Sequence, residues 1–251
     1  MSEIVDNRTV TLNSLFDGRL RCYQYENGYR FSIDSVLVSH FIKPKKNETV
    51  LDLGSGCGVI GLILLHRNSQ KLLTVTGLEK QADLVTISRK NIVTNNYGKK
   101  FEIIEGDAGN INDIFQPESF SMVISNPPFF VQNSGRLNKN RESMAARHQD
   151  DGTLTEFIQA AAYCLKNRGR FVTIYPAGSL TELLVELKIK KIETKRIRFV
   201  YPYPENEFGA KLVLVEGLKN GGGGAKVEPP LYVHQFKNGP HTEEILKMYE
   251  S

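Results

Sequence analysis

The sequence predicts an α/β protein with a doubly wound, mostly parallel sheet of seven strands and an antiparallel edge strand. Three observations predict this fold class. Apolar runs alternate with amphipathic stretches through the middle of the chain, a glycine-rich segment follows the first of these runs, and two apolar runs come in succession near the end. The alternation is typical of a parallel sheet with helices on both faces.

We expect the elements of this core in a regular order. Strands are expected at 49–53, 73–78, 101–105, 119–125, 170–175, 192–200 and 210–215. Helices are expected between them, at 59–66, 81–95, 153–166 and 179–187. Because a long loop with Pro202 and Pro204 joins the last two strands, we expect these strands to form an antiparallel pair at the edge of the sheet.

Both ends of the chain differ from this core. Near the start, the segment 26–28 follows an alternating stretch and indicates a hairpin turn, and Ser32 or Asp34 can cap a short helix. Near the other end, the glycines at 221–224 predict a hinge. A short strand and a helix are expected after it, at 231–236 and 243–249. We therefore divide the chain into an N-terminal extension (1–48), a core (49–217), and a glycine hinge with a C-terminal tail that packs on the core (218–251).

Composition and charge limit the class of protein. With 251 residues and 40% hydrophobic content, the chain can bury one large core. No apolar run is long enough to span a bilayer and the start lacks a basic segment followed by an apolar one, so we expect a cytoplasmic protein without membrane contact. The scattered Cys22, Cys57 and Cys164 predict neither disulfides nor a metal site. The sequence does not predict the oligomeric state.

Asn126-Pro127-Pro128-Phe129 is the motif most specific for a reaction. It ends a predicted buried strand, at the edge where open α/β sheets bind ligands. An exocyclic amine on a purine is a poor nucleophile, because its lone pair is delocalised into the ring. The Asn126 side-chain carbonyl and the Pro127 backbone carbonyl can accept hydrogen bonds from such an amine, and Phe129 offers a ring for stacking. Together with the glycine-rich segment, the motif indicates methyl transfer to a planar nitrogen. Without that segment, the motif is as consistent with a simple turn at the end of a strand as with a methyl-transfer site.

Three positions at successive strand ends indicate a nucleotide-like cofactor. In the glycine loop, residues 52–58, the glycines let a ligand approach the backbone at the start of a helix, although their spacing departs from the dinucleotide fingerprint. Glu79 ends the next strand and is placed to accept hydrogen bonds from both hydroxyls of a ribose, or it is an ordinary surface carboxylate. Asp107 follows the third strand and can accept from an adenine amine, or cap a helix.

Basic residues gather in two stretches. The net charge of +4 is too mild to indicate nucleic acid by itself. Cations in the first stretch follow the Asn-Pro-Pro-Phe motif and could bind phosphates around an inserted base. The second stretch is as consistent with a solvated helix end and edge strand as with an RNA contact. The candidate RNA-binding residues are Arg136, Lys139, Arg141, Arg147 and His148 in the first stretch and Lys195, Arg196 and Arg198 in the second.

The order of these motifs resembles a known family. The glycine loop, Glu79, Asp107-Ala108 and the Asn-Pro-Pro-Phe motif are similar to the Rossmann-like class I S-adenosylmethionine-dependent methyltransferases that modify amino groups, over about residues 49–216. A narrower resemblance lies at 29–37, at 141–148 and in the aromatic tail, to the bacterial tRNA(Val) adenine-N6 methyltransferase family. The match at 29–37 is inexact.

The resemblance implies S-adenosyl-L-methionine as the cofactor and tRNA as the substrate partner. It implies that the glycine loop contacts the methionine part of the cofactor, that Glu79 holds the ribose, and that Asp107 and Ala108 hold the adenine. The implied cofactor-binding residues are Phe31, Asp34, Asp52, Gly54, Ser55, Gly56, Gly58, Glu79, Asp107, Ala108 and Asn126. The implied catalytic residues are Asn126, Pro127, Pro128 and Phe129.

The expected reaction is direct displacement at the sulfonium methyl by a neutral adenine amine, on the adenine just 3′ of the anticodon, with alignment as the main catalytic effect. Three alternatives remain open. The same fold and turn could modify guanine N2 in ribosomal RNA or a glutamine in release factors. A nucleotide-dependent oxidoreductase is the second alternative, and a non-catalytic RNA-binding protein is the third.

Overall fold

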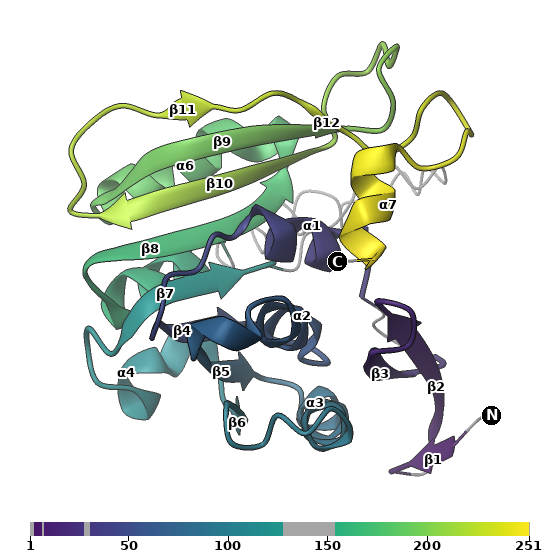
Figure 1. Ribbon diagram of the computed structural model, residues 1–251. Helices are drawn as coiled ribbons and strands as arrows, with labels where there is room; N and C mark the ends of the chain where they lie inside the picture. The colour runs from purple at the N-terminus through teal and green to yellow at the C-terminus, as the bar shows by residue number, and fades with distance from the viewer. Residues whose placement is uncertain (1–2, 7, 28–30, 128–153, 251) are drawn as a thin grey trace, which may run out of the picture.

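The computed structural model describes residues 3–6, 8–27, 31–127 and 154–250 and shows a large mixed sheet with helices on both faces (Figure 1). Its strands lie in the order β11-β9-β10-β8-β7-β4-β5-β6, and β12 pairs with β9. Neighbouring strands from β8 to β6 are parallel, whereas β10 is antiparallel to both β8 and β9. The strands are β4 (Thr49–Leu53), β5 (Thr74–Glu79), β6 (Phe101–Glu105), β7 (Phe120–Ser125), β8 (Leu165–Pro176), β9 (Ile192–Tyr201), β10 (Leu212–Lys219), β11 (Lys226–Val227) and β12 (Leu231–Tyr232).

Two apolar clusters, one on each face of this sheet, hold the helices in place. Neighbouring residues of β4, Val50 and Leu51, belong to different clusters, as expected for a strand buried on both faces. The first face carries α1 (Ile33–Phe41), α2 (Val59–Arg67), α3 (Ala82–Thr94) and α7 (Glu243–Glu250). The second face carries α4 (Ile111–Ile114), the helix at 154–164 and α6 (Leu180–Ile189).

The predicted fold class is confirmed, with a different number of strands. The doubly wound α/β arrangement and the antiparallel pairing of β9 with β10 are as expected. The sheet has nine strands, because the two-residue strands β11 and β12 of the tail add to the seven expected ones. A separate three-stranded sheet is formed at the N-terminus by β1 (Glu3–Val5), β2 (Arg8–Leu15) and β3 (Leu20–Tyr25).

The N-terminal hairpin formed by β2 and β3 turns earlier than the sequence analysis predicted. Leu15 pairs with Leu20, so the turn between these two strands lies at 16–19; the predicted turn at 26–28 extends to residue 28, which lies outside the described residues. Phe16 adopts a φ of 54°, in the left-handed region that phenylalanine rarely occupies. Its ring is nevertheless only 1% exposed and stacks on His66, with ring centroids 4.7 Å apart. Burial of the ring offsets the cost of this turn, and such a tertiary contact cannot be predicted from local sequence.

Two strand boundaries also differ from the prediction. Strand β8 begins at Leu165, before the expected start at 170, and its pairing with β7 shifts register between Phe120 and Met122. The strand expected at 231–236 is only two residues long. The chain folds back after it, and His234 bridges to His241.

Candidate active site

The predicted site segments gather at the carboxyl edge of the parallel strands. Because β4, β5, β6 and β7 run in one direction side by side, the residues after each strand meet at the same edge (Figure 1). Gly54, Glu79, Asp107 and Asn126 come from four different strand ends and line one cavity of about 410 Å³. A cavity of this size is within the range of small-molecule sites.

The glycine loop turns its backbone toward this cavity. The amide of Gly54 donates to the carbonyl of Leu78, 2.9 Å away, as the chain leaves β4. Gly54, Gly56 and Gly58 all have positive φ, a region that favours glycine. A Cβ atom at Gly54 would lie 2.9 Å from the ring of Phe157. The loop therefore requires glycine at this position both for its backbone conformation and for its packing.

Glu79, at the end of β5, joins the glycine loop to the start of α3. Its Oε2 accepts a hydrogen bond from the amide of Gly56 at 2.8 Å, and its Oε1 accepts from the amide of Gln81 at 2.9 Å. The residue is 7% exposed, so it is not an ordinary surface carboxylate. Each carboxylate oxygen can accept a further hydrogen bond. The carboxylate can therefore bind two hydroxyls of a ligand while it holds the loop.

Asp107 faces the cavity and also caps the short 3-10 turn Ala108–Asn110. Its Oδ1 accepts from the amide of Gly109 at 3.0 Å. Its Oδ2 lies 2.6 Å from Nζ of Lys80, and this contact lowers the pKa of the Asp107 carboxyl below its ordinary value. Both roles weighed for Asp107, the cap and the position at a ligand site, are therefore combined in one residue. Ala108 follows it in the cavity wall.

Asn126 follows β7 and lines the cavity. In the sheet, β7 lies on one side of β4, whereas β5 and β6, which lead to Glu79 and Asp107, lie on the other side. Its Oδ1 atom is buried and has no hydrogen-bond partner within the described part of the chain. A buried amide oxygen without a donor is costly, so a ligand that brings an N–H group would be stabilised here. The next residue, Pro127, is buried. Pro128 and Phe129 lie outside the described residues.

Asp52 and Ser55 belong to the glycine loop, but their side chains are buried and are not among those that line the cavity. Asp52 is fully buried, and its Oδ2 accepts from Oγ of Ser55 at 2.8 Å. Burial raises the pKa of the Asp52 carboxyl to about 7. The Asp52 carboxyl therefore supports the loop from below, and its charge state changes near neutral pH.

Three further predicted cofactor residues do not line the cavity. Gly58 is the N-cap of α2. Ser32 caps α1 by accepting from the amide of Asp34 at 3.3 Å, and burial raises the pKa of the Asp34 carboxyl. The amide of Phe31 donates to Oε1 of Gln24 at 2.8 Å. The predicted cofactor contacts of Phe31, Asp34 and Gly58 remain predictions.

The sequence analysis missed part of the cavity wall. Leu78 and Lys80 flank Glu79, and their position at the strand end could have indicated them. Phe157 lies on the helix at 154–164, whose contact with the loop depends on tertiary packing. The lining residues that were not predicted are Leu53, Leu78, Lys80, Gln81, Leu84, Gly106, Glu156 and Phe157.

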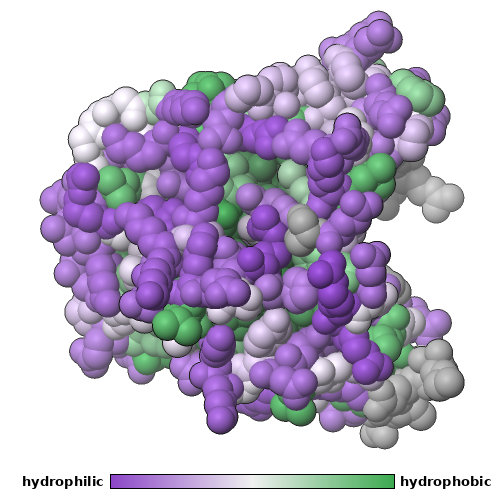
Figure 2. All heavy atoms as spheres, viewed as in Figure 1, coloured by the Kyte–Doolittle hydropathy of each residue, from purple (hydrophilic) through white to green (hydrophobic). Residues whose placement is uncertain are grey.

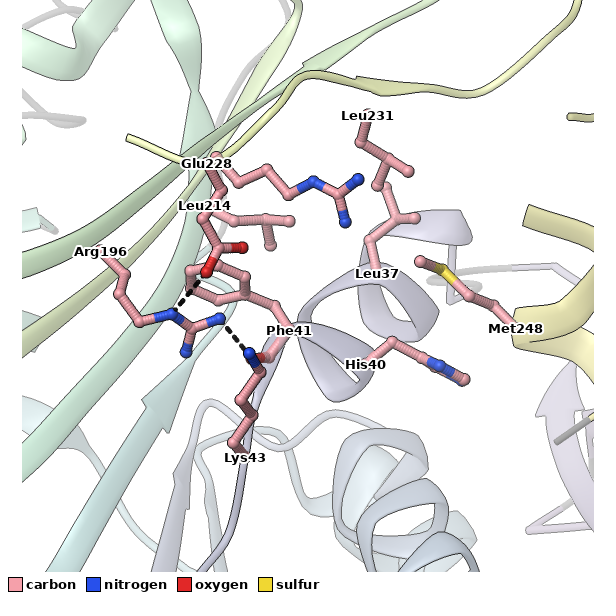
Figure 3. Close-up of a pocket in the computed structure, with 10 residues that line it drawn as sticks. Leu37, His40, Phe41, Lys43, Arg196, Leu214, Glu228, Leu231 and Met248 are labelled. Atoms are coloured by element: carbon pink, nitrogen blue, oxygen red, sulfur yellow. Dashed lines mark hydrogen bonds and ion pairs between the residues drawn. The ribbon is translucent and has the colours of Figure 1, made fainter. Parts of the chain in front are cut away.

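Arg196, one of the predicted RNA-binding residues, has protein partners on all sides. Figure 3 shows its guanidinium between Glu228 and the backbone of Phe41, at 2.9 Å from Glu228 Oε1 and 3.3 Å from the Phe41 carbonyl oxygen. Its Nη1 lies 2.6 Å from Oε2 of Glu216, and its side chain is only 15% exposed. Arg196, Phe41 and Glu228 border a second cavity of about 130 Å³, which shares no lining residue with the one at Asn126. Arg196 therefore joins the tail to the sheet.

The other two predicted cations on β9 are also engaged with the tail. Arg198 pairs with Glu244 of α7 at 2.7 Å and has a side chain 17% exposed. Lys195 donates to the carbonyls of the glycine hinge at 222–224. This geometry gives no support to an RNA contact by Lys195, Arg196 or Arg198. Arg136, Lys139, Arg141, Arg147 and His148 lie outside the described residues.

Residues 32–196 match the family model of the methyltransferase small domain. The chain belongs to this family. The match spans the whole carboxyl edge described above, from the start of α1 through Gly54, Glu79, Asp107 and Asn126 to β9.

This member of the methyltransferase small domain family is similar to several proteins named tRNA1(Val) (adenine(37)-N6)-methyltransferase. It is 28% identical to that of Trichodesmium erythraeum over 178 residues, which are 65% of this chain and 73% of the relative. The corresponding proteins of Tolumonas auensis and Porphyromonas gingivalis are 26% and 28% identical over 60% and 62% of this chain. The matched region spans 61% of each of these two relatives.

Solved structures share the fold of this methyltransferase. A predicted O-methyltransferase of Agrobacterium tumefaciens superposes with a TM-score of 0.67 at 18% identity, over 86% of this chain and 95% of that one. TrmN of Thermus thermophilus superposes with a TM-score of 0.56 at 14% identity, over 74% of this chain and 48% of that one. At these sequence identities, the similarity shows a shared fold and nothing about the reaction.

Family membership confirms the predicted cofactor, S-adenosyl-L-methionine. When bound, this cofactor supplies an electrophilic methyl group on a sulfonium sulfur. The cavity fits it, because Gly54 and Gly56 expose backbone at one side and Glu79 offers carboxylate oxygens that can accept from the hydroxyls of a ribose.

Within the described ranges, no helix combines the length and the apolar character needed to cross a membrane. Among the same residues, no three His, Cys, Asp or Glu side chains form a group that could hold a metal ion.

Proposed function

We propose that this methyltransferase modifies the N6 amine of an adenine in tRNA, at the position just 3′ of the anticodon of valine tRNA. The buried, unpartnered Oδ1 of Asn126 at the cofactor cavity carries the proposal. It is an acceptor in the position where a planar amine can be methylated. The names of the similar proteins of Trichodesmium erythraeum and Tolumonas auensis support adenine in tRNA as the acceptor.

Asn126 and Pro127 act on the amine through their carbonyl groups. The Asn126 Oδ1 atom accepts from one N6 hydrogen and the Pro127 backbone carbonyl accepts from the other, which draws the nitrogen toward tetrahedral geometry. As the new N–C bond forms, the bond from the methyl group to the sulfonium sulfur would break and leave a neutral thioether. Positive charge would develop on the nitrogen, and both hydrogen bonds would strengthen. The alkylated amine then releases a proton to solvent. The chain therefore contributes alignment and electrostatic stabilisation, without a dedicated strong base. The roles predicted for Pro128 and Phe129, which lie outside the described residues, stay predictions.

The cofactor is held by residues of three strand ends. Glu79 accepts from the ribose hydroxyls, and Asp107 with Ala108 contacts the adenine. The glycine loop, with Asp52 and Ser55 beneath it, contacts the methionine part, and the segment 31–34 closes over it. Carboxylate oxygens paired with backbone amides are already oriented before the ligand arrives, which reduces the entropy lost on binding.

The N-terminal extension (1–48) and the tail (218–251) pack together beside the core (49–217). Support comes from the backbone amide of Phe16, which donates to the carbonyl of Tyr249 at 3.0 Å. Arg19 Nη2 donates to the carbonyl of Glu250 at 2.7 Å.

The proposed tRNA substrate also supports a cytoplasmic location.

The acceptor is tested by parallel reactions with labelled S-adenosyl-L-methionine. The purified protein is incubated separately with transcribed valine tRNA, total tRNA, ribosomal RNA and a release factor, and label in each acceptor is counted. We expect label in valine tRNA and in total tRNA. Label confined to ribosomal RNA or to the release factor would replace the proposed acceptor, and no transfer to any acceptor would favour a non-catalytic RNA-binding protein.

A further inference from the structure

Asn91, on α3, is a fully buried polar residue that contacts the glycine loop from behind. Its Nδ2 donates to the backbone carbonyl of Cys57 at 2.9 Å. Cys57 stands between Gly56 and Gly58, which both need positive φ. The hydrogen bond therefore fixes the carbonyl at the centre of the loop whose backbone faces the cofactor cavity.

The same side chain holds strand β3 of the N-terminal hairpin. Asn91 Oδ1 accepts from the amide of Tyr23 at 2.6 Å, and Nδ2 donates to the carbonyl of Tyr23 at 3.0 Å. The Nδ2 atom also lies 3.5 Å from Sγ of Cys22, which lies 3.8 Å from Sγ of Cys57. The Asn91 amide therefore hydrogen-bonds both the hairpin and the loop, which also contact each other at Cys22 and Cys57.

The orientation of the Asn91 amide is fixed by its partners. Two carbonyl oxygens face Nδ2, and one backbone N–H faces Oδ1. If the amide were reversed, an oxygen would face two carbonyls and an NH₂ group would face an N–H. No water is needed to satisfy the group, because every one of these polar atoms has a protein partner.

We propose that Asn91 is a positioning residue for cofactor binding, which holds the glycine loop in its binding conformation and ties it to the N-terminal hairpin. Asn91 does not line the cavity, so it acts through Cys57 and not by contact with the cofactor. Asn91 thereby connects the cofactor site to the hairpin, which lies outside the matched family region that begins at residue 32. Loss of the Cys57 contact leaves a buried carbonyl without a donor and frees the loop to leave its binding conformation.

Asn95 provides a matched control one turn further along α3. Its side chain also ties α3 to β3, because Oδ1 accepts from the amide of Arg21 at 2.9 Å and Nδ2 donates to the carbonyl of Arg21 at 2.7 Å. It has no contact with the glycine loop among its hydrogen bonds. Asn95→Ala therefore loosens the hairpin from α3 and leaves the Cys57 carbonyl bound.

The test compares Asn91→Ala, Asn91→Asp and Asn95→Ala in the full-length protein. Titration calorimetry measures the Kd for S-adenosyl-L-methionine, and hydrogen exchange measures protection of the loop amides at 56–58 in protein without cofactor. For both Asn91 variants we expect Kd to rise on the order of tenfold and loop protection to fall. Asn91→Asp keeps the acceptor for the Tyr23 amide, so it isolates loss of the donor. In turnover assays KM for the cofactor should rise with kcat changed less than about threefold.

For Asn95→Ala we expect a lower Tm with Kd within about twofold of wild type. Equal weakening of binding by Asn91→Ala and Asn95→Ala would mean that both act through general stability, and would overturn the proposal. An unchanged Kd in Asn91→Asp would also overturn it. If Asn91→Ala gives little folded protein, Asn91→Ser replaces it in the same comparison.

Discussion

The carboxylate of Glu79 accepts a hydrogen bond from the amide of Gly56, 2.8 Å away, and so connects the end of β5 to the glycine loop that follows β4. Its other oxygen accepts from the amide of Gln81 at 2.9 Å. Both protein partners are donors, and the ribose hydroxyls of a bound cofactor would be donors as well. The site therefore requires a group that only accepts.

This requirement predicts the effect of Glu79→Gln. A glutamine has an NH₂ group in place of one oxygen, which would face a backbone N–H. We expect the Kd for S-adenosyl-L-methionine to rise about fiftyfold or more, measured by titration calorimetry. Glu105 is the register partner of Glu79 on β6 and is exposed, so Glu105→Gln is the matched control and should bind within about twofold of wild type. Tight cofactor binding by Glu79→Gln would show that the ribose lies elsewhere.

A second prediction separates chemistry from cofactor binding. Asn126→Ala removes the buried acceptor at the reaction centre, so we expect kcat to fall about a hundredfold or more. The Kd for the cofactor should stay within about threefold, because the carboxylate and loop contacts remain. Asn110, at the end of the 3-10 turn, does not line the cavity, and Asn110→Ala should keep normal turnover. Normal kcat in Asn126→Ala would refute its catalytic role.

A third prediction follows from the raised pKa of Asp52. The carboxyl ionises near pH 3.8 in the unfolded chain and near pH 7 in the folded protein. Protonated Asp52 is therefore favoured by folding, and its contribution to the free energy of unfolding is present below about pH 4 and is lost as pH rises to about 7. Asp52→Asn is neutral throughout, so it should exceed wild type in stability by an amount that grows over this window, up to on the order of 4 kcal/mol.

Urea unfolding of cofactor-free protein between pH 4 and pH 8 measures this difference. The exposed Asp113 provides the control, and Asp113→Asn should change the free energy of unfolding by less than about 0.5 kcal/mol. A constant difference between Asp52→Asn and wild type would be incompatible with a carboxyl that titrates near neutrality.

A fourth prediction concerns the role of Arg196. Its removal leaves the carboxylates of Glu216 and Glu228 without this partner in a largely buried setting. We expect Arg196→Ala to lower the free energy of unfolding by about 3 kcal/mol in urea unfolding. The side chain of Lys188, which precedes β9, is 73% exposed. Lys188→Ala should therefore change the free energy of unfolding by less than about 0.5 kcal/mol. If Arg196→Ala keeps its stability but loses tRNA affinity in a binding assay, Arg196 is an RNA contact and not a structural cation.

The features that could be predicted from sequence are those set by local pattern and strand direction. Glu79, Asp107 and Asn126 follow apolar runs, and parallel strands bring their ends to one edge, so their convergence was predictable. The contacts of Asn91 and Phe157 with the glycine loop could not be predicted, because each contact depends on how a helix packs against the loop. Arg196 was only a candidate RNA-binding residue, and its ion pairs with Glu216 and Glu228 were not predictable, because a basic stretch alone does not show which of its side chains will be buried against carboxylates from distant segments.

The central claim, methylation of a tRNA adenine through Asn126, is tested most directly by mass spectrometry of nucleosides from treated valine tRNA. The account predicts N6-methyladenosine in the wild-type transcript. It predicts none when the adenine just 3′ of the anticodon is replaced by guanine, and none with Asn126→Ala. A methylated nucleoside other than N6-methyladenosine, or the same yield from the guanine-substituted transcript, would contradict it.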